Sequence, residues 1–130
     1  MAFIKPLLGH TPEFGTDCFI ADNATIIGQF KCGDGCSFWF GSVIRGDVNS
    51  ITFGDKVNVQ DNATVHCTYE KFPTTVGNNV SIGPYCIIND NVIIGNNVVL
   101  KAHVYLDGNT TIGDNCTFYP YCSIGSSPQD

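Results

Sequence analysis

The sequence predicts an all-β fold, a single parallel β-helix spanning residues 1–130, and two observations carry this prediction. A large apolar residue recurs at every sixth position, and the residue two places before it is generally small or β-branched. Turn-forming pairs such as Gly–Asn, Gly–Pro and Asp–Gly separate these apolar pairs. An α-helix has an apolar period of 3.6 residues, and a plain strand is not broken every few residues. Short extended segments with two inward side chains, each followed by a turn, therefore repeat along the chain.

The apolar ladder stays in phase through most of the chain, with two interruptions. In the second half the inward positions are Val76, Ile82, Ile88, Ile94, Leu100, Leu106, Ile112, Phe118 and Ile124. Upstream they are Ile20, Ile26, Cys32, Phe38 and Ile44, and, after a shift of three residues, Phe53, Val59 and Val65. An insertion of five residues, carried by residues 66–75, then precedes Val76. Interruptions of a solenoid map to loops on one face, where function is often found. Residues 1–17 are expected to form an N-terminal arm, and no segment has the pattern of a C-terminal helix.

Composition excludes several classes of partner. The formal net charge is −6 with only 6 Lys and Arg, so no basic stripe is available for nucleic acid or for an anionic membrane. The first fifteen residues lack the pattern of a signal peptide, and no apolar run approaches the roughly 18 residues of a membrane helix. The seven cysteines form no CxxC pair, and six of them occupy repeat slots that favour a small apolar side chain. They are expected to be buried, reduced thiols of a cytoplasmic protein.

Four stretches of the first part of the chain share a recognisable pattern: FIADNATIIG, SFWFGSVIRGDVNSITFG, NVQDNATVHC and VGNNVSIG. Through these stretches residues 1–83 resemble the γ-class carbonic anhydrase-like hexapeptide proteins. The resemblance implies a left-handed β-helix with three hexapeptides per coil, assembled as a homotrimer. It implies that Arg45, Asp47 and Asp61 form salt bridges across the subunit interface, that Gln60 lies near the catalytic solvent, and that His66 is a metal ligand.

The other two metal ligands of that family do not match this sequence. The family has histidines shortly after the SIG segment, where this chain has Pro84 and Asn89. Proline has no donor atom and an amide is a poor zinc ligand, whereas catalytic zinc needs three protein ligands and an open position for water. If three hexads form a coil, Val65 lies over Ile88, so His66 and Asn89 are neighbours on successive coils. We expect a vestigial site with no cofactor; zinc or iron would bind only if the γ-class site survives. His10 and His103 match no ligand position and are expected at the surface.

From residue 76 to residue 130 the sequence resembles a different family, the N-terminal coils of UDP-N-acetylglucosamine acyltransferase. IGPYCII, VLKAHV, LDGNTTIG and the final SIG with PQD carry this resemblance. It implies that Gln129 and Asp130 contact a substrate. The catalytic histidine, the acyl-chain groove and the C-terminal helices of that family lie beyond the matching stretch.

The change of resemblance near residues 76–83 preserves the phase of the repeat, which favours a recombined or engineered chimera. Three functions remain open. The first is a β-helix scaffold, a homotrimer without catalysis, and the lost ligands favour it. The second is a metal-dependent γ-class hydratase that acts through His66 and Gln60. The third is an acyltransferase-like module that binds a nucleotide sugar.

Overall fold

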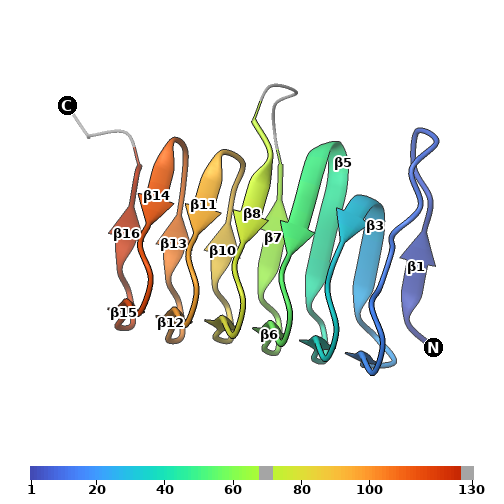
Figure 1. Ribbon diagram of the computed structural model, residues 1–130, viewed down its shortest axis with the longest axis horizontal. Helices are drawn as coiled ribbons and strands as arrows, with labels where there is room; N and C mark the ends of the chain where they lie inside the picture. Colours follow the sequence, from blue (N-terminus) through green and yellow to red (C-terminus); the bar gives the residue numbers. More distant parts are fainter. Residues whose placement is uncertain (68–71, 127–130) are drawn as a thin grey trace.

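The chain folds as a parallel β-solenoid whose coils are stacked along one long axis (Figure 1). The structure is a computed structural model, in which residues 1–67 and 72–126 are described. Strand β1 lies at one end of the stack and β16 at the other (Figure 1). Within the described ranges every element is a strand and none is a helix, as the sequence predicted. It follows that no helix in the described part is long and apolar enough to cross a membrane.

Short parallel strands form three faces, so that each coil crosses one strand of every face in turn. The first face contains β2 (Phe19–Ile20), β4 (Ser37–Phe38), β6 (Asn58–Val59), β9 (Ser81–Ile82), β12 (Val99–Leu100) and β15 (Thr117–Phe118). The second contains β1 (Phe3–Lys5), the beginnings of β3 (Thr25–Lys31) and β5 (Val43–Phe53), β7 (Thr64–His66), β10 (Ile87–Ile88), β13 (Tyr105–Leu106) and β16 (Ser123–Ile124). The third contains the ends of β3 and β5, β8 (Thr74–Val76), β11 (Val92–Ile94) and β14 (Thr110–Ile112).

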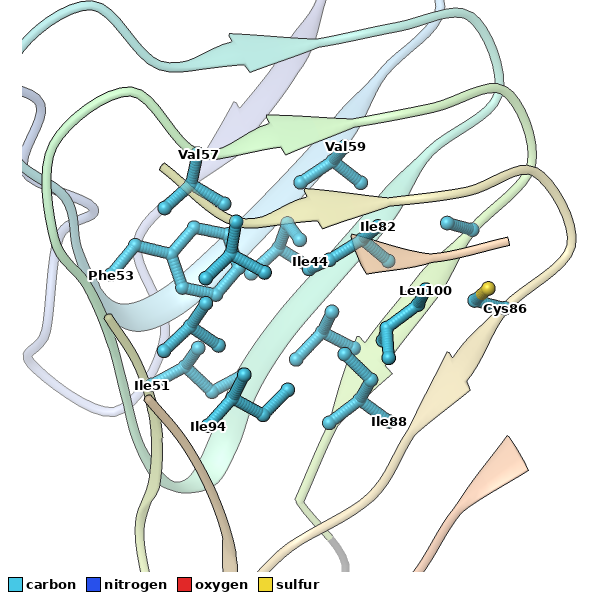
Figure 2. Packing of buried hydrophobic residues seen from close by; sticks show 14 of the residues in the cluster. Ile44, Ile51, Phe53, Val57, Val59, Ile82, Cys86, Ile88, Ile94 and Leu100 are labelled. Carbon is cyan, nitrogen blue, oxygen red and sulfur yellow. The ribbon is translucent and has the colours of Figure 1, made fainter. Parts of the chain in front are cut away.

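The predicted inward residues form the core. Their side chains converge inside the coil from all three faces, as Ile44, Phe53 and Val59 illustrate in Figure 2. Ile44, Ile82 and Ile88 are completely buried, and the same holds for most members of the ladder in the central coils. Toward the C-terminal end, Phe118 and Ile124 are only partly buried. Burial of about 25 cal/mol per Å² of apolar surface makes these stacked columns the main stabilising contribution.

A ladder of hydrogen bonds along one corner holds successive coils in register. In each coil an Asp or Asn side-chain oxygen accepts the backbone N–H of the corresponding residue in the preceding coil, at 2.7–2.8 Å. The acceptors are Asp34, Asp55, Asn78, Asn96 and Asp114, and the donors are Thr16, Asp34, Asp55, Asn78 and Asn96. The partners are 18, 21, 23, 18 and 18 residues apart along the chain. The spacings of 21 and 23 correspond to the predicted shift of three residues and insertion of five.

Both interruptions leave the register of the faces intact. In β5, Gly46 pairs with Gly28 and Ile51 pairs with Phe30, so residues 47–50 form a bulge opposite Gln29. The second interruption lies between β7 and β8; residues 68–71 of the predicted 66–75 insertion are outside the described part of the chain. The bulge follows Arg45 within β5, and Arg45 pairs with His66 at the end of β7, so the two irregular segments begin at the same corner on adjacent coils.

The N-terminal residues 1–17 begin with a strand rather than running free of the solenoid. β1 pairs in parallel with the beginning of β3, so it adds a strand to the edge of the second face. A tight turn follows, in which Leu7 and His10 exchange two backbone hydrogen bonds of 2.9 and 3.0 Å. Glu13 then pairs with Lys31 on the third face. These contacts cover part of the first edge of the β-helix.

The corner ladder requires glycine at the position before each donor, which yields a test. A Cβ atom on Gly77 would lie 2.5 Å from Asn96 Oδ1 and 2.6 Å from the carbonyl oxygen of Gly95. We expect Gly77→Ala to lower the free energy of unfolding by about 1–3 kcal/mol, because the overpacked coils must move apart. Gly113→Ala is the matched control: it has the same place in the repeat, and no described atom lies within 4 Å of its added Cβ. Urea unfolding of both variants measures the difference, and equal losses would contradict the steric explanation.

Candidate functional site

A column of polar side chains lies at the corner where the strands of the second face end; we call it the His66 corner. Arg45 and His66 are register partners on β5 and β7. Val65 pairs with Ile88, and Ile88 pairs with Leu106. His66, Asn89 and Asp107, each one residue later, therefore follow one another on successive coils, as the sequence predicted for His66 and Asn89.

Asn89 is held in a hydrogen-bond network inside this corner. Its side chain is only 8% exposed. The amide nitrogen donates to the Tyr105 hydroxyl at 3.0 Å and to Asp107 Oδ1 at 3.1 Å, and the Tyr105 hydroxyl lies 3.4 Å from Asp107 Oδ2. The backbone oxygen of Asn89 accepts a hydrogen bond of 2.8 Å from the buried Thr74 hydroxyl. Asn89 is therefore fixed by β8 on one side and by the β13 coil on the other.

Three buried polar atoms of the corner have no hydrogen-bond partner within the described residues. They are Asp47 Oδ1, His66 Nδ1 and Asn89 Oδ1. An unpaired buried polar group typically costs about 1–3 kcal/mol, and two of these three atoms are oxygens that can only accept. The corner is thus suited to a group that brings N–H or O–H donors from outside the chain.

The electrostatic environment keeps His66 neutral near pH 7. Burial lowers the pKa of the His66 imidazole below its ordinary value near 6.5, and the neighbouring Arg45 guanidinium lowers it further. The carboxylates of Asp47, Asp90 and Asp107 act in the opposite direction but do not reverse the shift. Desolvation therefore outweighs three nearby negative charges.

Cys67, the residue after His66, is not an activated nucleophile. Burial raises the pKa of its thiol to about 11. Its sulfur lies 3.9 Å from the backbone oxygen of Ser50 in the β5 bulge. Since the thiolate is the reactive form, Cys67 is a protonated packing residue at neutral pH.

The residues present do not fit the metal centre that the γ-class resemblance implies. Asn89 turns its amide nitrogen, which has no lone pair for a metal, toward Tyr105 and Asp107. Pro84 has no donor atom and precedes β10, whereas Asn89 follows it, so the two ligand positions lie at opposite ends of that strand. In the described ranges no group of three His, Cys, Asp or Glu residues could hold a metal ion. No zinc-dependent step can be derived from this arrangement.

The structure separates the predicted site residues into two groups. Arg45, Asp47, His66 and Asn89 come together at the His66 corner. Gln60 and Asp61 follow β6 and lie with Pro84 at the opposite end of the second face, where the backbone oxygen of Asp61 accepts the Tyr85 N–H at 3.2 Å. Gln129 and Asp130 lie outside the described residues.

The three predicted interface charges have no ionic partner among the residues that the structure describes. Within residues 1–67 and 72–126, no ion pair is formed by Arg45, Asp47 or Asp61. The Arg45 side chain is exposed. Two aromatic side chains are also exposed, Phe40 at 48% and Phe19, on β2 of the first face, at 45%. The backbone oxygen of Phe40 accepts the N–H of Asn62, the residue after Asp61, at 3.0 Å. Charged and aromatic groups thus share this surface.

The two other histidines are at the surface, as predicted. His10 is exposed in the N-terminal turn. His103 stacks between the rings of Tyr85 and Tyr121, with centroids 5.1 Å apart on each side. All three residues of this stack have positive φ values, between 59° and 69°, in a turn position where asparagine occurs elsewhere in the chain. The stack gives His103 a packing role outside the His66 corner.

Sequence reasoning missed Tyr105, Asp107 and Asp90. The signal for Asp107 was present, because it stands 18 residues after Asn89 in the same place of the repeat. Tyr105 stands two positions earlier on the same outward side of β13. Asp90 follows Asn89 directly and is only 8% exposed. Extending the column by one coil would have identified the whole network.

Comparison with known proteins gives two kinds of match. Residues 73–108 and 91–126 match the family described as bacterial transferase hexapeptide (six repeats). The crystal structure of a hexapeptide transferase family protein from Anaplasma phagocytophilum superposes with a TM-score of 0.72 at 30% identity, covering 86% of this chain and 75% of that one. The fold is therefore a hexapeptide left-handed β-helix.

The sequence relatives include both enzyme classes suggested by the motifs. A protein of Geobacillus kaustophilus named carbonic anhydrase is 35% identical over 104 residues, which is 80% of this chain and 57% of the relative. The acyl-[acyl-carrier-protein]–UDP-N-acetylglucosamine O-acyltransferase of Rickettsia peacockii is 55% identical over 56 residues, 43% of this chain and 21% of the relative. The chain thus spans about half the length of the first relative and much less of the second.

The lowered pKa of His66 predicts a pH dependence of stability. The unfolded chain takes up the proton near pH 6.5, whereas the native chain takes it up only at lower pH. The contribution of His66 to the free energy of unfolding is therefore fully present above pH 6.5. It is lost as the pH falls through the pKa of His66 in the native chain. Between pH 7 and pH 5 the free energy of unfolding, measured in urea, should decrease less in His66→Gln than in the wild type. His10→Gln, which removes an exposed imidazole, is the control and should retain the wild-type slope; a similar flattening in both variants would contradict the assignment.

Proposed function

We propose that this chain, which belongs to the hexapeptide-repeat family of bacterial transferases, is a β-helix scaffold that assembles as a homotrimer. On this proposal the scaffold holds no metal and has no catalytic activity. The observation that carries the proposal is the state of the His66 corner. Buried acceptor atoms there have no partner in the described chain, while Asn89 stands in a ligand position with its amide nitrogen already engaged.

Self-association is supported by charges that form no ion pair among the described residues. Arg45 brings a guanidinium with five N–H donors, and Asp61 brings a carboxylate, and neither forms an ion pair within the described residues. Arginine–carboxylate pairs between subunits are directional and specify the orientation of the partner. Phe19 and Phe40 add exposed aromatic area, which is typical of the apolar part of an interface.

Absence of catalysis is supported by the chemistry of the corner. Within the described residues, the neutral His66 belongs to no group of three His, Cys, Asp or Glu side chains that could hold a metal ion. Cys67 is protonated because burial raises its pKa to about 11. Neither a metal-bound hydroxide nor an activated thiol is therefore expected at neutral pH.

The proposal includes a recombined or engineered origin and a cytoplasmic location. The alignment with the Geobacillus carbonic anhydrase covers 80% of the chain, so it necessarily continues past residue 83. This overlap favours exchange between two related repeat proteins over a fusion of unrelated segments. All seven cysteines are free thiols, which is typical of a reducing compartment.

Two other functions are kept as alternatives. A γ-class hydratase that uses His66 and Gln60 is favoured by the carbonic anhydrase relatives. A module that binds a nucleotide sugar at the C-terminal coils is favoured by the 55% identity to the Rickettsia acyltransferase. Calorimetric titration with UDP-N-acetylglucosamine tests the second alternative, and saturable binding would replace the scaffold proposal.

Assembly is tested by removing the interface charges one at a time. We expect the chain to sediment near three times its mass of 14.0 kDa. Arg45→Ala and Asp61→Ala should each weaken the trimer by about 2–5 kcal/mol, because truncation leaves the opposite charge unpaired. Lys31→Ala removes one exposed cation of the third face and is the control for net charge. A wild-type monomer, or equal weakening by Lys31→Ala, would contradict the proposed interface.

Metal content and activity test the absence of catalysis. We expect the purified chain to hold far less than one zinc or iron per chain by elemental analysis, because two of the three ligand positions are Pro84 and Asn89. Carbon dioxide hydration should not exceed the uncatalysed rate. His66→Ala is the control for adventitious metal. Stoichiometric metal that is lost in His66→Ala, together with hydration activity, would support the γ-class alternative instead.

A further inference from the structure

Three thiols gather inside the first coils of the β-helix: Cys18, Cys32 and Cys36. The sulfur of Cys18 lies 3.9 Å from the sulfur of Cys32. Cys36 stands 18 residues after Cys18 in the same place of the repeat, and its thiol donates to the backbone oxygen of Gly54 at 3.3 Å. The Cys18 thiol also reaches the backbone oxygen of Gly33 at 3.5 Å. The sulfurs of Cys67 and Cys86 contact backbone oxygens, Ser50 O at 3.9 Å and Lys101 O at 2.9 Å.

The three thiols differ in their access to solvent. Cys32 is 6% exposed and Cys36 is 1% exposed. Cys18 is only partly buried, because it belongs to the first coil and no full coil covers it on the N-terminal side. Phe14, itself partly buried, packs against the core on that side. A small polar reagent can therefore reach Cys18 before it reaches the other two sulfurs.

We propose that Cys18 and Cys32 form a peroxide-sensitive pair that closes to an intramolecular disulfide. The Cys18 thiolate attacks hydrogen peroxide; an S–O bond forms, the O–O bond breaks, and hydroxide leaves and takes up the proton released by the Cys18 thiol, giving water. Cys32 sulfur then attacks the sulfenic sulfur and releases its own proton as the S–S bond forms. The displaced hydroxide takes that proton and leaves as a second water. Two thiols supply the two electrons that reduce the peroxide.

The geometry permits this closure with a local movement. A disulfide bond is about 2.05 Å long, so the two sulfurs must approach by about 2 Å. Cys18 is only partly buried and lies in the first coil, which the N-terminal residues cover in part, so its side chain has more room to move than a core cysteine. The bond would join residues 14 positions apart and enclose β2 and β3. Closing this loop restricts the unfolded chain and so fastens the end of the solenoid against fraying.

Peptide mapping of the full, native chain tests the pair. After treatment with equimolar hydrogen peroxide and blocking of free thiols, we expect mass spectrometry under non-reducing conditions to find a Cys18–Cys32 link. The thermal midpoint should rise by several degrees, and dithiothreitol should reverse the rise. Sulfinic acid at Cys18 without a link, or a link to a different cysteine, would overturn the proposal. These readouts use the wild-type chain and depend on neither the trimer nor the absence of metal.

Variants test the pair itself. Cys18→Ser should abolish the link and the thermal shift, whereas Cys122→Ser, which removes a partly buried cysteine near the other end, should preserve both. Equal behaviour of Cys18→Ser and Cys122→Ser would overturn the pair itself.

Discussion

The register between successive coils is the constraint on which the rest of the molecule depends. A slip of one residue would exchange inward and outward side chains throughout a strand. It would also break the corner ladder, because each Asp or Asn oxygen fits the space that a glycine of the preceding coil leaves open, as Asn96 fits beside Gly77. Apolar packing and the polar ladder therefore specify the same alignment. Extra residues are tolerated only where the chain leaves and rejoins a corner, as in the bulge at 47–50.

The same register builds the candidate site. Residues about 20 positions apart become neighbours when they share a place in the repeat, so His66, Asn89 and Asp107 form one column. The chemistry of the column is then decided by the residue type that each coil supplies. Asn89 donates a hydrogen bond to Asp107, whereas a second imidazole in place of Asn89 would offer a metal a ligand. A single side chain can thus change the chemistry while the coil, whose inward residue is Ile88, is unaffected.

The architecture could be predicted from the sequence because each hexad of the repeat corresponds to one strand and one turn of a coil. Counting hexads predicted the three-residue and five-residue interruptions and placed His66 beside Asn89. It could not predict which way the Asn89 amide turns, since that depends on Tyr105 and Asp107 one coil further on. The hexad pattern also did not predict that the Cys18 and Cys32 sulfurs lie close together. Both residues occupy ordinary core slots, and their contact arises where two inward columns meet at a corner rather than along one column.

The unpaired polar atoms at the His66 corner favour association of several copies of the chain. The His66 corner contains buried acceptors at Asp47 and Asn89 that no described group of the same chain satisfies, while the exposed Arg45 forms no ion pair in the described residues. Burying an unpaired acceptor costs about 1–3 kcal/mol, and a charged donor from outside removes that penalty and gains a charge-assisted hydrogen bond. A second copy of the chain offers such donors, and in a closed ring every copy both gives and receives them. The drive to associate on this proposal is therefore polar satisfaction at the corner, which persists whether or not a metal can bind there.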